Sequence, residues 1–314
     1  MRPFFLSVLA AVLVLTAAGG CQSRQAAVTG GKVEVVATFF PLYDFACQVG
    51  GERAHVTCLV PPGVSVHEWE PTPGDLTRVL AADMLLFNGA GLEPWIEGIL
   101  PEIRGKVLVK ATRGLTLSRF TSGHGTTEAH DDGHHYVYDP HAWVDPVNAQ
   151  HYVKQVAAGL IKADPAGSAY YRQRAGDFIV RLQRLDGEYR AAAAGFKRKE
   201  IVTSHAAFGY LAARYGLEQI PVAGLSPQAE PSAARLKELV RLLREREIAY
   251  VFFEELASPR MAETLAREAG VKTLVLSPVV GATPEERAGT KGYVAVMEEN
   301  LAALKKALGQ GGVQ

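Results

Sequence analysis

The feature that most constrains the fold of this chain is a repeated alternation between short apolar runs and helical patterns. In the first part of the chain the apolar runs lie at Val33–Phe40, Val56–Val60, Met84–Phe87 and Val107–Val109. Helical patterns separate these runs, at Leu42–Val49, Asp75–Ala82 and Pro94–Leu100. Strands that alternate with helices pair in parallel and are covered by those helices, so this part predicts an α/β lobe over residues 32–147.

The same alternation restarts after residue 195 and predicts a second lobe over residues 196–314. Its apolar runs lie at Glu200–Thr203, Ile220–Ala223, Ala249–Phe253 and Thr273–Leu276. Its helical patterns lie at Ala206–Tyr215, Ser232–Arg246, Pro259–Ala269 and Tyr293–Leu308. In parallel sheets, ligands bind beyond the carboxyl ends of the strands, so residues that follow these runs are the candidates for a site.

Residues 148–195 form a connector with helical periodicity throughout. A first helix is expected at Asn148–Lys162, and Asp164-Pro165 then provides an N-cap and a first helical residue for a second one. The second helix, Ala166–Ala194, would be roughly 43 Å long at about 1.5 Å per residue. The expected fold class is therefore α/β, with two (βα)n lobes whose parallel sheets are joined by a long rigid helix.

The first twenty residues predict a secretory signal peptide. Arg2 is their only charged residue, and the apolar run Phe4–Ala18 is shorter than the about 20 residues that span a bilayer. Small residues lead into Cys21, as in the lipobox of bacterial lipoproteins, so Cys21 is the expected site of lipidation. Residues 21–31 would then be a flexible tether. Simple secretion and a retained anchor are the alternatives.

The remaining composition excludes some partners and some kinds of site. The 314 residues include 33 basic and 33 acidic side chains, so no charge excess indicates nucleic acid binding. The chain has 3 cysteines, too few for a disulfide framework or a cysteine-based zinc site. Cys47 and Cys58 either pair in an oxidising compartment or remain buried free thiols.

A histidine in a stiff loop is the first candidate ligand. His67 follows the run Val56–Val60, and prolines and a glycine surround it, at Pro61, Pro62, Gly63, Pro71 and Pro73. Proline fixes φ and biases the preceding residue toward extended backbone, so this loop has little freedom. A surface histidine with no ligand is the alternative interpretation of His67 alone.

A second group of histidines lies in the polar stretch 118–136. Its members are His124, His130, His134 and His135. The stretch is too polar to bury a core and predicts a disordered loop. Tracts of this composition bind metal weakly, so these side chains are candidate auxiliary ligands, and a solvated linker is the alternative.

Two further histidines are candidates, one in a setting like that of His67 and one at the end of a predicted strand. His141 lies between Pro140 and Pro146, and His205 follows the run Glu200–Thr203. Neutral imidazoles suit zinc and similar divalent metals, and ligands from both lobes can form a site at their interface. A histidine that stabilises the fold by hydrogen bonding is the alternative for each one taken alone.

Together, these motifs resemble the zinc and manganese solute-binding lipoproteins of bacterial ABC importers. The motifs, in the order in which that family has them, are His67-Glu68-Trp69-Glu70-Pro71-Thr72-Pro73-Gly74-Asp75, Asp139-Pro140-His141-Ala142-Trp143-Val144-Asp145-Pro146, Thr203-Ser204-His205, Glu230-Pro231-Ser232 and Phe252-Phe253-Glu254. The resemblance implies two lobes with a metal between them and His67, His141 and His205 as its ligands. It also implies an extracytoplasmic, lipid-anchored monomer that docks onto a membrane permease.

The fourth ligand is where the chain departs from the pattern of that family. The family usually places an aspartate before the proline where this chain has Ser277-Pro278, and a serine hydroxyl is a poor ligand. The candidates for the fourth position are Glu254, Glu68, Glu70, Ser277, a histidine of the 118–136 loop and water. Water or a nearby glutamate is favoured.

The ligand set also selects the metal. Manganese-binding members place a carboxylate where this chain has His205, and manganese prefers oxygen ligands, so three imidazoles favour Zn²⁺ over Mn²⁺. Asp139 and Asp145 flank His141 and are candidates to orient its ring, with surface ion pairing as the alternative.

The expected function is high-affinity capture of zinc outside the cytoplasm and delivery to an ABC importer, without enzymatic activity. A zinc hydrolase or hydratase is the competing class, because three histidines and water also form a catalytic arrangement. Glu254 is the evident base candidate outside the His67 loop, and an HExxH motif is missing from the sequence. Manganese binding, adhesin-like roles and metal sensing are the remaining alternatives.

Overall fold

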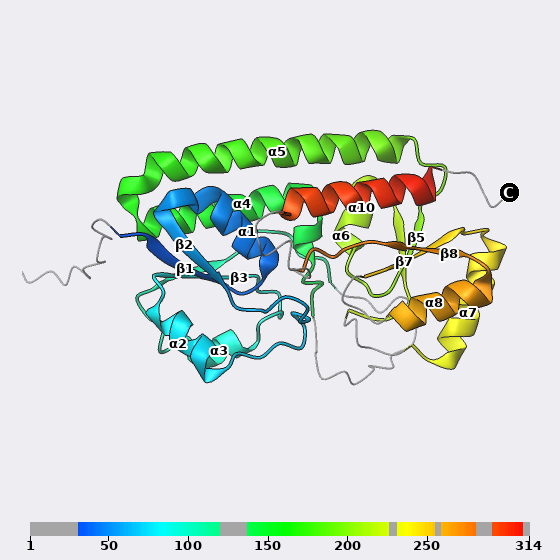
Figure 1. The fold of residues 1–314 in the computed structure, drawn as a ribbon, viewed down its shortest axis with the longest axis horizontal. Coiled ribbons are helices and arrows are strands. Elements are labelled where there is room, and N and C mark those ends of the chain that lie inside the picture. The colour runs from blue at the N-terminus through cyan, green and yellow to red at the C-terminus, as the bar shows by residue number, and fades with distance from the viewer. Residues whose placement is uncertain (1–30, 120–136, 226–230, 255–258, 281–290, 310–314) are drawn as a thin grey trace, which may run out of the picture.

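The computed structural model describes residues 31–119, 137–225, 231–254, 259–280 and 291–309. Two parallel sheets lie side by side, and one long helix runs across both of them (Figure 1). The predicted fold class is confirmed.

The first sheet is built from four parallel strands in the order β2-β1-β3-β4. The strands are β1 (Val33–Ala37), β2 (Ala54–Cys58), β3 (Met84–Phe87) and β4 (Val107–Lys110). In the register, Ala37 pairs with Cys58 on one side and with Leu86 on the other. Because the strands are parallel, the residues that follow them meet at one edge of the sheet.

The second sheet repeats this pattern with the strand order β6-β5-β7-β8, again all parallel. The strands are β5 (Glu200–Thr203), β6 (Glu218–Pro221), β7 (Tyr250–Phe253) and β8 (Lys272–Val275). The edge strand β6 begins two residues earlier than the apolar run at Ile220 suggests, because Glu200 already pairs with Glu218.

Helices cover both faces of both sheets. In the first lobe, α1 and α4 lie on the side of the long helix α5, and α2 and α3 lie on the opposite side (Figure 1). In the second lobe, α6 and α10 lie on the side of α5, and α7 and α8 lie opposite. Their bounds are α1 (Phe40–Gly50), α2 (Pro73–Ala81), α3 (Trp95–Ile99), α4 (Pro146–Ala163), α5 (Ser168–Ala194), α6 (Gly209–Tyr215), α7 (Ala233–Glu245), α8 (Pro259–Ala269) and α10 (Tyr293–Leu308). Short 3-10 turns are η1 (Gly51–Arg53), η2 (Ala142–Val144) and η3 (Pro165–Gly167).

The helix α5 packs against both lobes through one face. Its 27 residues place buried side chains at intervals of three and four positions, which keeps them on one side of the helix. The buried members are Tyr171, Ala175, Phe178, Leu182, Leu185, Tyr189 and Ala193. One core cluster continues under this face from the first lobe into the second, whereas smaller clusters lie under α2 and α3 and under α7 and α8.

The carboxylate of Asp44 in α1 ties the first lobe to the N-terminus of α10. It accepts a hydrogen bond of 3.0 Å from the backbone nitrogen of Tyr293, and the ring of Phe45 lies 5.0 Å from that of Tyr293. Burial raises the pKa of Asp44, against the effect of the hydrogen bonds from Gln48 and Tyr293. The terminal helix therefore stabilises the junction of the two lobes.

Several predicted boundaries were wrong for local reasons. The first strand ends at Ala37 rather than Phe40, because Pro41 occupies the first turn of α1, where its missing N–H and fixed φ suit a helix. The helix predicted from Ala206 begins only at Gly209. The long helix begins at Ser168, after Pro165–Gly167 has formed a separate 3-10 turn.

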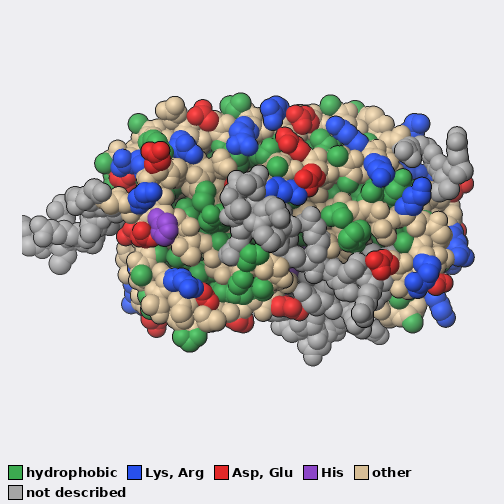
Figure 2. Space-filling view, in the orientation of Figure 1, with side chains coloured by type: hydrophobic (Ala, Val, Ile, Leu, Met, Phe, Trp, Pro, Cys, Tyr) green, Lys and Arg blue, Asp and Glu red, His purple; other side chains and the backbone are tan. Residues whose placement is uncertain are grey.

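Three further predictions concern the cysteines, membrane-spanning segments and surface charge. The thiols of Cys47 and Cys58 are half-buried and do not form a disulfide, and burial raises the pKa of Cys47 to about 11. None of the helices in the described ranges has the length and apolar character that a membrane crossing requires. On the face shown in Figure 2, basic and acidic side chains are intermingled over both lobes, in keeping with the balanced composition.

Candidate metal centre

The structure gathers His67, His141 and His205 into one buried cluster between the lobes. Their exposed fractions are 5%, 0% and 1%, and candidate ligand atoms of the three side chains all lie within 4.8 Å of one another. The ring centroids are separated by 5.0, 5.2 and 5.8 Å. Histidines separated by more than sixty residues in the sequence thus meet at one point.

Each histidine reaches this point from the end of a strand or from a loop. His67 lies in the loop between β2 and α2, His141 immediately precedes η2, and His205 follows β5. The α2 end of the first loop is fixed by a capping box, in which Thr72 and Asp75 bond reciprocally. The site therefore lies at the carboxyl ends of strands, as parallel α/β sheets favour.

The ring of His141 is oriented by a carboxylate. Asp139 Oδ1 accepts hydrogen bonds from His141 Nδ1, at 2.8 Å, and from the His141 backbone nitrogen, at 2.9 Å. Because Nδ1 carries the proton that is donated to Asp139, the lone pair of neutral His141 lies on Nε2. Asp145 has another role, since it caps α4 and pairs with Arg214.

The ring of His205 is oriented in the same way from the second lobe. Its Nδ1 contacts Glu254 Oε1, which follows β7, so its Nε2 carries the lone pair. Within the described part of the chain this Nε2 is buried and lacks a hydrogen-bond partner. A buried polar atom without a partner costs stability unless a ligand satisfies it.

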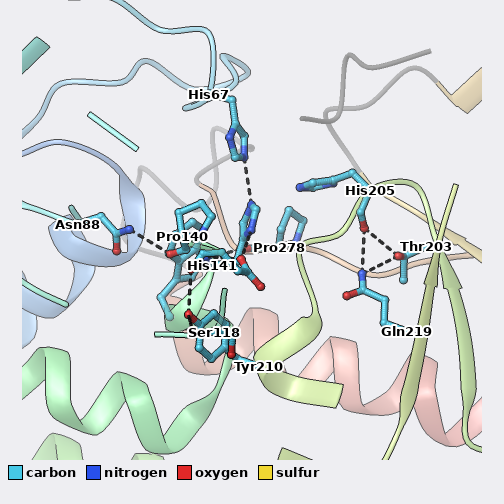
Figure 3. A network of polar contacts seen from close by, with 12 residues as sticks. His67, Asn88, Ser118, Pro140, His141, Thr203, His205, Tyr210, Gln219 and Pro278 are labelled. Atoms are coloured by element: carbon cyan, nitrogen blue, oxygen red, sulfur yellow. Dashed lines mark hydrogen bonds and ion pairs between the residues drawn. The ribbon is translucent and has the colours of Figure 1, made fainter. Parts of the chain in front are cut away.

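Figure 3 shows the rings of His67 and His141 approaching each other, with His205 beside them. The two Nε2 atoms of His67 and His141 are 3.1 Å apart. Nitrogen ligands at about 2.0–2.1 Å from a tetrahedral zinc ion are separated by roughly 3.3 Å, so this spacing fits a shared ion. The donor set therefore fits a borderline divalent metal.

The electrostatics of the site favour neutral imidazole. Burial lowers the pKa of His141, and His205 adds to this effect, while Asp139 and Glu254 oppose it. A neutral ring is the form that binds metal, because protonation occupies the ligand lone pair. Desolvation thus keeps His141 ready to coordinate at pH values where an exposed histidine is partly charged.

The carboxylates and hydroxyl considered for the fourth position do not join the three imidazoles among the described residues. Glu254 lies on the Nδ1 side of His205, opposite the lone pair. Glu68 and Glu70 are exposed, and the hydroxyl of Ser277 accepts a hydrogen bond from the Val279 backbone nitrogen at 3.2 Å. The histidines of the polar stretch, His124, His130, His134 and His135, lie outside the described residues, as does Cys21.

Sequence reasoning missed the amides that hold the backbone of the site. Asn88 Nδ2 donates to the Pro140 carbonyl at 3.0 Å, and Gln219 Nε2 donates to the His205 carbonyl at 3.0 Å (Figure 3). Tyr210 from the second lobe donates to the Asp139 carbonyl at 2.9 Å. The one local signal was the position of Asn88 directly after β3.

Comparison with known proteins gives a consistent set of relatives. Residues 35–307 match the family described as "Zinc-uptake complex component A periplasmic". The chain is 40% identical over 313 residues to the high-affinity zinc uptake system protein ZnuA of Bacillus subtilis, covering 96% of this chain and 97% of that protein.

Solved structures show the same architecture. The chain superimposes on Zn(II)-bound AdcA from Streptococcus pneumoniae with a TM-score of 0.77 and 39% identity, covering 90% of this chain and 59% of that one. It superimposes on the laminin-binding protein Lmb of Streptococcus agalactiae, described as an adhesin with metal transporting activity, with a TM-score of 0.79 and 30% identity, covering 88% and 99%. The chain thus spans nearly the whole of Lmb but only part of AdcA.

Proposed function

The chain belongs to the family of periplasmic zinc-uptake components, and from that premise we propose that it captures one zinc ion between its lobes and delivers it to the permease of an ABC importer. His67, His141 and His205 bind the ion through Nε2. The observation that carries this proposal is the buried Nε2 of His205, which has no hydrogen-bond partner among the described residues and lies beside the other two rings.

The chemistry of the donors supports zinc rather than manganese. Three neutral imidazoles form the cluster, and the carboxylates of Asp139 and Glu254 contact Nδ1 atoms instead of joining the ligand atoms. Manganese prefers oxygen ligands, whereas zinc accepts nitrogen in tetrahedral sites. The relative AdcA is named as Zn(II)-bound in its solved structure, which agrees with this choice.

A water molecule is proposed as the fourth ligand. Zinc prefers four ligands, and the protein supplies three in the described residues. Glu254 supports His205 from behind, and Ser277 already accepts a hydrogen bond, so both are assigned to holding the site. A water ligand would fill the position that the family usually fills with an aspartate and at which this chain has Ser277.

The setting of the site outside the cytoplasm remains part of the proposal. Residues 1–20 would direct export, Cys21 would carry the lipid, and 21–31 would tether lobes assigned to 32–147 and 196–314 around the connector 148–195. The protein would act as a monomer docked on its permease. The histidine-rich stretch 118–136 would bind metal weakly.

The hydrolase alternative loses support from the relatives. ZnuA and AdcA are named for zinc uptake and zinc binding, and Lmb for adhesion and metal transport, rather than for catalysis. Glu254, the base candidate, contacts the Nδ1 atom of a proposed ligand. An adhesin-like role would rest on the description of Lmb alone.

The test is a zinc titration of the mature chain against a competing chromophoric chelator. We expect one tight site per chain, and a higher melting temperature with zinc, because a ligand that binds only the folded state stabilises it. Each of His67→Ala, His141→Ala and His205→Ala should weaken zinc binding by more than about 100-fold, beyond the effect of outer-sphere changes.

The matched control is His55→Ala, because His55 is exposed and pairs with Glu34 on β1, away from the site. Its zinc affinity should equal that of the unaltered chain. Tight binding that survives in the triple variant of His67, His141 and His205 would overturn the site assignment.

A further inference from the structure

The backbone just before His141 is held from the first lobe by the side chain of Asn88. Asn88 follows β3, and its Nδ2 donates to the carbonyl of Pro140, 52 residues away and adjacent to His141. This hydrogen bond fixes the orientation of the peptide plane between Pro140 and His141. The direction of the His141 side chain therefore depends on Asn88.

The amide of Asn88 is fixed in one orientation by its surroundings. Tyr152 of α4 donates from its hydroxyl to Asn88 Oδ1 at 2.6 Å. The carbonyls of Gly89 and Pro140 lie on the Nδ2 side, at 3.1 and 3.0 Å. Carbonyls only accept, so the nitrogen must face them, and the Tyr152 hydroxyl holds the oxygen on the other side.

The backbone of Asn88 is fixed as well, by a carboxylate that is not part of the metal cluster. Glu93 is 7% exposed and accepts from the backbone nitrogens of Asn88, at 2.8 Å, and Gly89, at 2.9 Å. It also accepts from the hydroxyl of Thr38, after β1, at 2.7 Å. The Asn88 carbonyl accepts from the Thr112 hydroxyl, after β4, at 2.6 Å. Burial raises the pKa of Glu93. The hydrogen bonds from its three donors oppose this effect and offset part of the cost of burying the carboxyl group.

These contacts connect the ends of three strands of the first sheet to one backbone carbonyl beside the metal cluster. The buried polar groups satisfy one another, so the network is rigid and specific in its geometry. The second lobe has a comparable device, since Gln219 donates to the carbonyl of His205 and to the hydroxyl of Thr203. The network around Asn88 is the more extensive and the more deeply buried.

We propose that Asn88, locked by Tyr152 and Glu93, is a positioning residue that sets the zinc affinity of the site by fixing where His141 Nε2 points. The inference rests on the proposed function, since it concerns the same three-histidine site. Asn88 does not contact the ion. It acts on His141 indirectly, through a hydrogen bond to the Pro140 carbonyl, whereas Asp139 bonds the His141 ring itself.

The experiment compares two Tyr→Phe variants, each of which removes one buried hydroxyl group. Tyr152→Phe removes the hydroxyl that holds the Asn88 amide, whereas Tyr189→Phe removes a buried hydroxyl that donates to the Met297 carbonyl, between α5 and α10. Both should lower the melting temperature of the zinc-free chain to a similar extent. Only Tyr152→Phe should weaken zinc binding, by about 10-fold, the low end of the range for outer-sphere partners.

A second variant and a spectroscopic signature test the same point directly. Asn88→Asp keeps the shape but replaces the donor with an oxygen that repels the Pro140 carbonyl, so its loss of affinity should exceed that of Tyr152→Phe. With cobalt(II) in place of zinc, Tyr152→Phe should shift the visible absorption bands, which report ligand geometry, and Tyr189→Phe should leave them unchanged.

Equal zinc affinity and equal cobalt spectra in Tyr152→Phe and Tyr189→Phe would overturn the inference, while leaving the proposed function intact. If Asn88→Asp does not fold, the comparison of the two tyrosine variants decides alone. An unaltered chain that binds no zinc tightly would instead refute the proposed function, and the inference with it.

Discussion

The loop of His67 and the turn of His141 bring two of the proposed ligands to the same point but are held by different interactions. The His141 turn is held by hydrogen bonds from both lobes, with Asp139 on the ring and Asn88 and Tyr210 on the preceding carbonyls. Among the described residues, the His67 loop packs through Trp69, whose ring centroid lies 6.0 Å from that of Trp95, and the capping box of Thr72 and Asp75 fixes its α2 end. Its backbone contact with Ser65 lies within the loop itself.

This difference indicates that the two ligands respond differently to perturbation. Hydrogen-bonded networks are directional, so they fix an angle, whereas apolar contacts fix a location and tolerate small rotations. We expect His141 to be set before the metal arrives and His67 to complete the site when the metal binds. Three changes test this contrast, beginning with the largest expected effect.

The first change removes the charge behind His141. Asp139→Asn should weaken zinc binding by about 10- to 100-fold, as for other carboxylates that orient a ligand histidine. The equivalent change in the His67 loop, Ser65→Ala, removes the hydroxyl that accepts from the His67 backbone nitrogen. Chelator competition should show an effect of Ser65→Ala of less than about threefold, below the outer-sphere range. Equal losses in the two variants would contradict the contrast.

The second change attacks the packing of the His67 loop. Trp69→Ala removes a half-buried ring from Trp95 and should lower the free energy of unfolding by about 2 kcal/mol, less than a fully buried tryptophan costs. Urea unfolding of the zinc-free chain measures this. Zinc affinity should fall more in Trp69→Ala than in Ser65→Ala. The reverse order would show that polar contacts, rather than packing, hold the loop.

The third and smallest effect concerns proton binding by His141. Its pKa in the folded chain lies below the ordinary value of 6.5, chiefly because of burial. As the pH falls below 6.5, the unfolded chain binds this proton first, so the contribution of His141 to stability is present at neutral pH and decreases toward the lower folded pKa.

NMR of the zinc-free chain tests that prediction directly. The ¹⁵N shifts of His141 should report a proton on Nδ1 and a titration midpoint below the ordinary value of 6.5. A midpoint at or above 6.5 would show that Asp139 outweighs burial in setting the pKa of His141.

Much of the fold was accessible from the sequence for local reasons, whereas the three histidines were only candidates until the resemblance to the metal-binding lipoproteins implied that they act together. The hydrophobic periods of strands and helices can be recognised from neighbouring residues. His67, His141 and His205 follow predicted strands or lie near turn residues. Strand ends meet at one edge of a parallel sheet, so separated histidines were candidates for one site. The helix of Ser168–Ala194 was predicted within two residues at its start.

Asp139 was predicted to orient His141 because it is a near neighbour in the chain, but the other supporting residues were not accessible, because their partners are distant in the chain. The hydrogen bond from Asn88 to Pro140 spans 52 residues and leaves no periodic trace. Glu254 had a plausible local setting as a ligand or base, and only the structure shows that it meets His205 on Nδ1. A side chain's distance from a site can be guessed from topology, but which ring atom it meets requires coordinates.

The continuous core beneath α5 limits how an ion can leave. Trp143 of the first lobe donates to the carbonyl of Pro278 in the second, and Tyr293 donates to the carbonyl of Trp143, all within the buried junction. A wide rotation of the lobes away from each other would expose these rings to water, at a free-energy cost of about 1.5–3 kcal/mol for each large side chain. Release by withdrawal of the His67 loop avoids that exposure. The radius of gyration should therefore change little between the zinc-bound and zinc-free protein, and small-angle scattering should not distinguish the two states.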